Sequence, residues 1–206
     1  MSDIPILLVG GGGHCRSCID VIEMIPGIRI AGIVEQPGKE DSGDVLGYPV
    51  LGSDEDLHGL RHQYGHALVT IGQIGPPLAR EKAFSRLKNL GFQLPALASP
   101  LAYVSKNGSL GEGTLVMHQA VVNAGVRIGD NCIINTGALV EHDVRIGDHA
   151  HISTRAVING GATVGGGSFI GSHATVVHGV HLPAQHFFKA SALIIRGEDG
   201  RPFHQD

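Results

Sequence analysis

The chain contains an adjacent histidine and aspartate, His142-Asp143, that is suited to acid-base chemistry. An imidazole can accept a proton near neutral pH, and a neighbouring carboxylate can fix its tautomer and stabilise the imidazolium as it forms. His142 lies two residues past Val140, which occupies an inward position of the repeat described below, so we expect the His142 side chain to point outward. A solvated surface histidine is the alternative interpretation of these residues.

A run of four glycines, residues 10–13, follows a short apolar run and precedes an expected helix. Backbone N–H groups in such a loop can approach a phosphate, and a helix N-terminus favours the negative charge. The G-x-G-x-x-G pattern of dinucleotide-binding loops fails, because Cys15 or Arg16 stands where its third glycine belongs. Glu35 follows at a strand end, where it can accept from a ribose hydroxyl or a base edge. These features favour a nucleotide sugar over NAD, with a turn that merely needs a left-handed backbone as the alternative.

Cysteines provide no disulfide framework, since only Cys15, Cys18 and Cys132 are present. Cys15 and Cys18 form a C-x-x-C pair, which could suggest redox or metal chemistry. Both fall on the apolar face of the expected first helix, and no second pair accompanies them. We therefore expect them to pack in a core.

Composition excludes several classes of protein. The chain has 206 residues, of which 31 are glycine and 42% hydrophobic, which fits one or two folded units rather than a disordered chain or a collagen. Its net charge of -4 offers no basic surface for nucleic acid. The N-terminus lacks the basic and apolar regions of a signal peptide, and no apolar run approaches the roughly 18 residues of a membrane helix. We expect a cytoplasmic protein that binds neither nucleic acid nor membrane.

The first 94 residues alternate apolar runs with helical patterns. Expected strands cover residues 4–9, 28–34 and 66–71, and expected helices follow the glycine run and cover residues 54–61 and 76–90. Strands that alternate with helices indicate a parallel sheet. Residues 1–94 are thus predicted to form a small Rossmann-like α/β domain.

From Val104 to Leu182 an aliphatic residue recurs every six positions, and Phe188 and Ile194 continue the register. A small side chain stands four residues after most of them. A period of six suits one flat side of a triangular coil, so that three sides make an 18-residue turn and successive turns stack as parallel strands. Residues 95–206 are therefore predicted to form a parallel β-helix. We expect glycine to supply its tight corners, at Gly111, Gly129, Gly147, Gly165 and Gly171.

This repeat resembles that of the hexapeptide-repeat acyltransferases, whose β-helix is left-handed. The left hand is implied by the resemblance alone, because ordinary crossovers are right-handed. The GGGGH loop, combined with INTGALVEHD at residues 134–143, is more narrowly similar to bacterial nucleotide-sugar N-acetyltransferases that acetylate a 4-amino-4,6-dideoxy sugar, and to the related sialic-acid O-acetyltransferases. The resemblance implies a nucleotide-sugar substrate, acetyl-CoA as co-substrate, no metal, a homotrimer and a role in surface polysaccharide synthesis. Whether the nucleotide is UDP, GDP or dTDP stays open.

The resemblance also implies roles for individual residues. His142 is implied as general base, oriented by Asp143, and Gly160 as the N–H donor to the oxyanion of the thioester. A corner glycine is the alternative for Gly160. His151 and Gly160 are implied to contact the coenzyme, and Asn135 to help place the sugar. The contacts implied for the nucleotide sugar in the first domain are Gly11, Gly12, Gly13, His14, Glu35, Ile71 and Gly72.

Two further functions fit parts of the sequence. The γ-class carbonic anhydrases are also left-handed β-helices, and they bind zinc through three histidines, two of which are five residues apart. Two pairs in this chain have that spacing: His173 with His178, and His181 with His186. The positions in the coils below either pair carry no histidine, so no zinc set assembles. A non-catalytic nucleotide-sugar-binding protein is the other alternative, because the closing Gly-x-Pro segment of the related enzymes comes early here, at residues 200–203.

Overall fold

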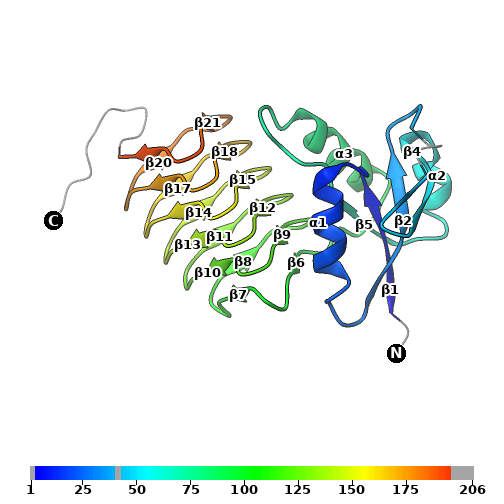
Figure 1. Ribbon diagram of the computed structural model, residues 1–206, viewed down its shortest axis with the longest axis horizontal. Coiled ribbons are helices and arrows are strands. Elements are labelled where there is room, and N and C mark those ends of the chain that lie inside the picture. Colours follow the sequence, from blue (N-terminus) through cyan, green and yellow to red (C-terminus); the bar gives the residue numbers. More distant parts are fainter. Residues whose placement is uncertain (1–2, 40–42, 196–206) are drawn as a thin grey trace. The chain divides into compact units, whose positions relative to one another are not determined.

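The computed structural model describes residues 3–39 and 43–195, and the chain divides into two compact units (Figure 1). One unit comprises Met1–Gly72 and Leu78–Pro95, and the other comprises Gln73–Pro77 and Ala96–Asp206. Residues 200–203, considered above for coenzyme contacts, lie outside the described residues. Within the described ranges, no helix has both the length and the apolar character needed to cross a membrane.

The first unit is built on a five-stranded sheet with the strand order β3-β4-β2-β1-β5. Its strands are β1 (Ile4–Val9), β2 (Ile28–Glu35), β3 (Asp44–Val45), β4 (Tyr48–Ser53) and β5 (His66–Val69). All neighbouring pairs are parallel except β3 and β4. Because β1 lies between β2 and β5, the loop that leaves its C-terminal end emerges between the ends of these two strands, where ligands bind in open parallel sheets.

The helices of this unit are α1 (Gly13–Ile22), the 3-10 helix η1 (Asp54–Asp56), α2 (Leu57–Leu60) and α3 (Leu78–Asn89). Phe84 and Leu87 of α3 pack in one apolar cluster with Leu7 and Val9 of β1. The apolar face of α1 buries Cys15, Cys18, Ile19, Val21 and Ile22. Both cysteines are free and fully buried, which confirms their prediction as core residues.

The second unit is a parallel β-helix whose two-residue strands form three sheets. Successive strands along the chain belong to successive sheets, and paired residues are 18 positions apart, as in Val122 and Val140. Figure 1 shows the coils stacked one on the next. The first sheet contains β6 (Leu97–Ala98), β9 (Leu115–Val116), β12 (Ile133–Ile134), β15 (His151–Ile152), β18 (Phe169–Ile170) and β21 (Phe187–Phe188). The second contains β7 (Tyr103–Val104), β10 (Val121–Val122), β13 (Leu139–Val140), β16 (Val157–Ile158), β19 (Thr175–Val176) and β22 (Leu193–Ile194). The third contains β8 (Ser109–Leu110), β11 (Arg127–Ile128), β14 (Arg145–Ile146), β17 (Thr163–Val164) and β20 (His181–Leu182).

The core of the β-helix consists of the aliphatic residues of the six-residue repeat and the small residues four positions later. Ile134, Val140 and Ile158 are fully buried, and so are Ala138 and Ala156. Each strand directs its second residue inward and its first residue outward, since side chains alternate along a strand. The register of the repeat therefore decides which residues are presented on the outside of each sheet.

The corners of the coils differ from the prediction. From residue 113 to residue 191 every sixth residue has a left-handed backbone, and most of these are not glycine: Gly113, Gln119, Gly125, Asn131, Gly137, Asp143, His149, Arg155, Gly161, Gly167, His173, Gly179, Gln185 and Ser191. The five glycines expected at these corners are not among them. They stand instead where neighbouring coils come close, because a Cβ on Gly147 would lie 2.6 Å from the backbone nitrogen of Gly166. Close approach of coils, rather than φ, explains these glycines.

Candidate active site

His142 and Asp143 lie at the corner between the second and third sheets, just after β13. His142 Nδ1 is 3.0 Å from Asp143 Oδ2, and their side chains are 60% and 72% exposed. The left-handed φ of 61° at Asp143 belongs to the corner turn, and aspartate tolerates this conformation better than most residues. With Nδ1–H donating to the carboxylate, the lone pair of the imidazole is at Nε2. The predicted outward, carboxylate-paired histidine is thus what the structure shows.

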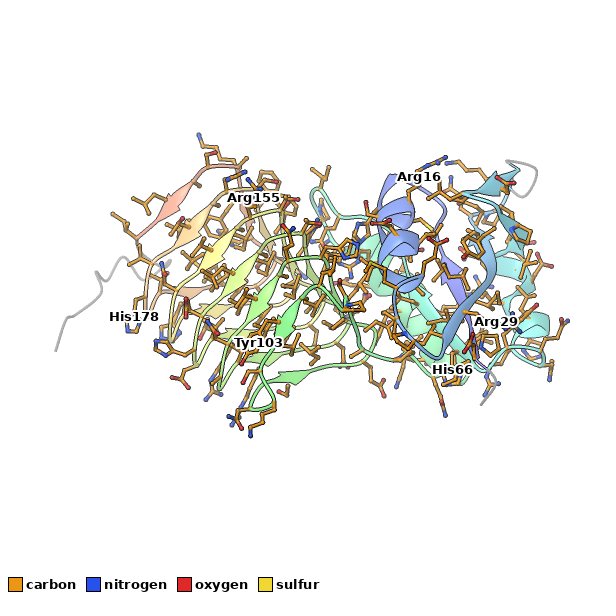
Figure 2. The ribbon with its side chains drawn as sticks, turned by 60° about the horizontal axis from the view of Figure 1, so that its bottom comes forward. Arg16, Arg29, His66, Tyr103, Arg155 and His178 are labelled. Atoms are coloured by element: carbon orange, nitrogen blue, oxygen red, sulfur yellow. The ribbon has the colours of Figure 1, made fainter. Side chains whose placement is uncertain are left out.

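Glycines above and below leave room for this pair. Gly160 lies one coil further along the same edge, and a Cβ on it would lie 2.6 Å from His142 Nε2. Gly125 lies one coil before, and a Cβ there would collide with the Asp143 carboxylate. Two coils beyond His142 on this edge, the ring of His178 is 6.3 Å from the His142 ring, centroid to centroid. His178 is labelled in Figure 2. A side chain at residue 160 would occupy this space.

The Gly160 N–H does not take part in the backbone hydrogen bonds that join one coil to the next. The neighbouring Gly161 N–H donates to the His142 carbonyl at 2.9 Å, and the Gly160 carbonyl accepts from Gly179. Among the described residues, no acceptor takes the Gly160 N–H. A donor beside the imidazole is therefore available to a substrate oxygen.

Asn135 and His151 lie on a different edge from His142. Asn135 Nδ2 is 3.0 Å from His151 Nε2, and Asn135 Oδ1 accepts from the Thr136 N–H at 2.7 Å. His151 is only 5% exposed, and its Nδ1 is 2.9 Å from the Gln73 carbonyl oxygen. The chain itself thus engages both ring nitrogens of His151, and a coenzyme group could reach Nε2 only by displacing Asn135. In one chain these two residues and His142 do not form one site.

Gln73 is a residue that the sequence analysis missed. Besides accepting from His151, its side-chain amide donates to the Gly167 carbonyl at 3.2 Å. It belongs to a short segment, Gln73–Pro77, that lies within the β-helical unit although the α/β unit precedes and follows it in sequence. No pattern of residue types in that segment signals this contact.

In the α/β unit, the glycine loop lines a cavity of about 340 Å³. All seven contacts expected in this unit line it: Gly11, Gly12, Gly13, His14, Glu35, Ile71 and Gly72. Glu35 Oε1 accepts from the Gly11 N–H at 2.9 Å, and Glu35 Oε2 accepts from the Gln36 N–H at 3.2 Å. The carboxylate is therefore fixed at the cavity wall by backbone donors, with lone pairs left for a further hydroxyl or N–H donor.

The reason for glycine differs along this loop. Gly10 has a φ of 102°, so a left-handed backbone requires it. Gly11 leaves room for the Glu35 carboxylate, which a Cβ would meet. Gly12 and Gly13 have ordinary φ values, and a Cβ on either would have nothing within 4 Å. Gly12 is the N-cap of α1, a position that accepts glycine, and the space beside both residues at the N-terminus of α1 is open to a ligand.

His14 is neutral in this cavity at physiological pH. Burial, with a smaller effect of the positive charge of Arg80, lowers the pKa of His14 from 6.5 to about 4. A Cβ on Gly72 would lie 3.1 Å from His14 Cβ, so Gly72 lets β5 and the start of α1 come together. The His14 ring can therefore donate one hydrogen bond and accept one, without adding a positive charge.

The described residues include no group of three or more His, Cys, Asp or Glu side chains that could hold a metal ion. His173 lies at a corner between the first and second sheets, whereas His178 lies on the edge of His142. His181 is on the third sheet. The histidine pairs considered for zinc are thus placed on different sides of the coils.

A hexapeptide β-helix with an exposed histidine-carboxylate pair at a coil corner is what the sequence resemblance predicts for a hexapeptide-repeat acyltransferase. Residues 5–87 match the family model of the PglD N-terminal domain, and residues 107–142 match the bacterial transferase hexapeptide model. A search of curated proteins gives no match. The chain is similar to solved structures of PerB, a perosamine N-acetyltransferase from Caulobacter crescentus, crystallised with CoA and GDP-perosamine. Identity to two of these is 35% and 36%, coverage is 94% of this chain and 89% of theirs, and TM-scores are 0.87 and 0.86.

The acetyltransferase domain of PglB from Neisseria gonorrhoeae, solved with acetyl coenzyme A, is 29% identical, with coverage of 95% of this chain and 93% of that one and a TM-score of 0.86. The chain belongs to the nucleotide-sugar acetyltransferase family of hexapeptide-repeat acyltransferases, and its β-helix is the left-handed one of that family. It is an enzyme, so the alternative of a non-catalytic binding protein is wrong.

Proposed function

We propose that this enzyme transfers the acetyl group of acetyl-CoA to the amino group of a sugar carried on a nucleotide. The observation that supports this most is the exposed imidazole of His142, held at Nδ1 by Asp143 with Nε2 beside the backbone of Gly160. The similar enzyme from Caulobacter crescentus was crystallised with CoA and GDP-perosamine, in the native form and with one histidine replaced. An amino sugar on a nucleoside diphosphate is the substrate class that follows.

His142 acts as the general base in this mechanism. Acetyl-CoA supplies an acyl group on a good leaving thiol, and the attacking amine must lose a proton to form a neutral amide. As the N–C bond forms and the C–S bond of the thioester breaks, His142 Nε2 takes the amine proton and can return it to the departing CoA thiolate, while Asp143 keeps the other nitrogen protonated and stabilises the imidazolium. Because the pair is exposed at a corner, both substrates can reach it without movement of the coil.

Gly160 has two roles in this proposal. Its lack of a side chain lets the His142 ring lie over the backbone, and its N–H is free to donate to the oxygen that gains charge during attack. A corner glycine needed only for φ is not consistent with the structure, because Gly160 is not left-handed.

The nucleotide is bound by the α/β unit, at the cavity formed by the glycine loop and Glu35. Gly12 and Gly13 let a diphosphate approach the N-terminus of α1, where the free N–H groups of the first turn favour negative charge. Glu35 accepts from a ribose hydroxyl or a base N–H. The α/β unit thus selects the nucleotide, and the β-helix performs the chemistry.

The outer face of the second sheet supports a homotrimer with shared sites. Its outward residues are apolar: Tyr103, Val121, Leu139, Val157 and Leu193, interrupted by Thr175. Tyr103 (labelled in Figure 2) and Leu193 are 59% and 68% exposed. The edge of Asn135 and the edge of His142 border this same sheet. If copies pack through it, His142 of one copy meets the Asn135 edge of the next, which brings together residues that one chain keeps apart.

The test is an assay of purified protein with acetyl-CoA and a panel of UDP-, GDP- and dTDP-linked sugars, in which thiol release is followed. The panel includes 4-amino-4,6-dideoxy sugars, their 4-hydroxy counterparts and a free sialic acid. Release that requires the amine supports N-acetylation, whereas release with only the hydroxyl sugars or with sialic acid contradicts it and identifies an O-acetyltransferase. Because acetyl-CoA and nucleotide sugars are both metabolites of the cytoplasm, we place the reaction there.

A further inference from the structure

The outer face of the third sheet carries a column of hydrogen-bond donors beside the His142 edge. Arg127 of β11 pairs in register with Arg145 of β14, with Ser109 before them and Thr163 after. Neighbouring strands lie about 4.8 Å apart. The two guanidinium side chains therefore leave the sheet from adjacent positions, on strands that Figure 1 shows as neighbours. We refer to Arg127 and Arg145 as the arginine ladder.

The arginine ladder is not neutralised by the described part of the chain. Both side chains are exposed, and neither makes an ion pair or a hydrogen bond with any described residue. Three carboxylates at the edges of this sheet make other contacts: Asp143 pairs with His142, and Asp130 and Asp148 accept backbone N–H bonds at the opposite edge. Like charges directly opposite on neighbouring strands destabilise a sheet. Proteins keep a destabilising arrangement of this kind where their function depends on it.

The ladder also borders open space. A cavity of about 450 Å³ is lined by Lys106, Ser109, Arg127 and Arg145, and by Asp143 of the proposed catalytic pair. On the other side of the ladder, a groove of about 390 Å³ runs past the same two arginines. Gly129, Gly147 and Gly165, where the coils come close, line this groove without side chains. Three cations, Lys106, Arg127 and Arg145, that make no ion pair with a described residue thus line a cavity that extends to Asp143.

We infer that Arg127 and Arg145, together with Lys106, bind a phosphate group of a substrate that reaches His142. A planar guanidinium can donate two hydrogen bonds to two oxygens of one phosphate. Two neighbouring guanidiniums can therefore hold several oxygens of the same phosphate group. This inference rests on the proposed function, in which both substrates carry phosphates. Because the glycine loop is proposed to take the diphosphate of the nucleotide sugar, acetyl-CoA is the expected source of the phosphate, and the nucleoside diphosphate is the other source. The experiment distinguishes the two sources.

Calorimetric titrations of the full chain with CoA, dephospho-CoA, UDP, GDP and dTDP test the inference without turnover. For Arg127→Gln and Arg145→Gln we expect a Kd about 10- to 100-fold higher for either CoA or the nucleoside diphosphate, as for loss of a hydrogen bond to a charged group. If CoA is affected, an equal effect on dephospho-CoA assigns its diphosphate, and a smaller effect assigns its 3'-phosphate. Arg145→Lys, which keeps the charge, should recover part of the affinity. Arg29→Gln, an exposed arginine at the start of β2, is the matched control.

Folding is verified by the melting temperature of each variant without ligand. Because Arg127 and Arg145 carry like charges on neighbouring strands, removal of one of them should leave this temperature unchanged or raise it. Unchanged Kd values for CoA and for all three nucleoside diphosphates overturn the inference, even if acetyl transfer is observed. A changed sedimentation mass with unchanged affinities also overturns it, and identifies the ladder as a contact between copies. Lost phosphate affinity in a protein that transfers no acetyl group overturns the proposed function and leaves the phosphate site standing.

Discussion

The imidazole of His142 and the backbone of Gly160 occupy adjacent coils so closely that a single added methyl group would overlap the ring. A Cβ on Gly160 would lie 2.6 Å from Nε2 and 2.7 Å from Cε1. The position of the proposed base is therefore set by a residue 18 positions later in the chain. This relationship makes the role of each residue testable through the other.

Replacement of His142 by alanine should lower kcat by roughly 10²- to 10⁴-fold, the usual contribution of a positioned acid-base group. Asp143→Asn should cost less, because the carboxylate only orients and stabilises the imidazole. Steady-state kinetics at saturating substrates measure both effects. His58→Ala, which removes an exposed histidine from α2, is the control. Activity of His142→Ala within about threefold of the native enzyme would contradict the assignment.

Gly160→Ala should lower kcat by roughly 10²-fold, because displacement of a catalytic group by about an ångström has an effect of this size. The substitution keeps the N–H and requires no unusual φ, so a loss points to the ring of His142. In a His142→Ala background the same change should have almost no effect on kcat. Additive losses in the double variant would show instead that Gly160 acts independently of His142. Gly59→Ala, where a Cβ meets nothing within 4 Å, is the control.

Gly12→Val should raise the KM for the nucleotide sugar by roughly tenfold or more, a change equivalent to 1.4 kcal/mol or above. A Cβ at residue 12 has nothing within 4 Å in the protein itself, so the added side chain should interfere chiefly with what approaches the loop. Its cost to stability at the N-cap should not exceed about 1 kcal/mol, which thermal melting measures. The KM for acetyl-CoA should stay nearly constant, and an equal rise in both constants would argue against a separate nucleotide site.

His14 should make the native protein less stable as the pH falls from 6.5 toward 4. Its pKa is about 4 in the folded chain and 6.5 as a free side chain. Between pH 6.5 and pH 4 the unfolded state binds the proton and the folded state does not. The contribution of His14 to the free energy of unfolding is therefore complete above pH 6.5, and it decreases by up to roughly 3 kcal/mol as the pH falls to 4. Urea unfolding at pH 7.5 and pH 5 should show this decrease, and His14→Gln should reduce it. An identical pH dependence in the variant would exclude His14 as its cause.

Leu139→Glu should separate the copies of the enzyme. Leu139 points outward from the middle of the apolar second sheet and is half-buried in the single chain, so a carboxylate there is tolerated by the fold but not by an apolar interface. Sedimentation should give a mass near three chains for the native protein and near one for the variant. Activity should disappear with the trimer if the sites are shared. Met24→Glu, at an exposed methionine after α1, controls for the added charge, and a fully active monomer would refute the shared site.

The sequence predicts the β-helix well because its period is local and repeated. Ile134, Val140 and Ile158 point inward in the structure because each coil copies the constraint of the one before. The corners were predicted less well. The interpretation of Gly147 as a turn residue was wrong, since period alone does not distinguish a residue that needs a left-handed φ from one that needs a close neighbour. Asp143 is the opposite case, because it is not glycine and yet has the left-handed backbone of the corner.

The site shows the same division. His142 and Asp143 are adjacent in sequence, and Glu35 ends the strand that pairs with the one before the glycine loop. Both relationships are local enough for the sequence motif and the structure to agree. The burial of His151 depends on Gln73, which is 78 positions away and belongs to a segment inserted between parts of the other unit. No local pattern contains that contact, and only the folded chain shows it.

Backbone pairing that joins each coil only to its immediate neighbours gives this enzyme a modular length. Because every coil repeats the same 18-residue pairing, duplication or deletion of a whole coil beyond Ile170 would keep each remaining side chain on its own face. Such a change would alter the height of the column and leave the chemistry at His142 untouched. An insertion of six residues would instead rotate everything after it by one face, moving apolar and charged surfaces around the axis. Lineages of this fold can therefore vary in size freely, but only in whole turns.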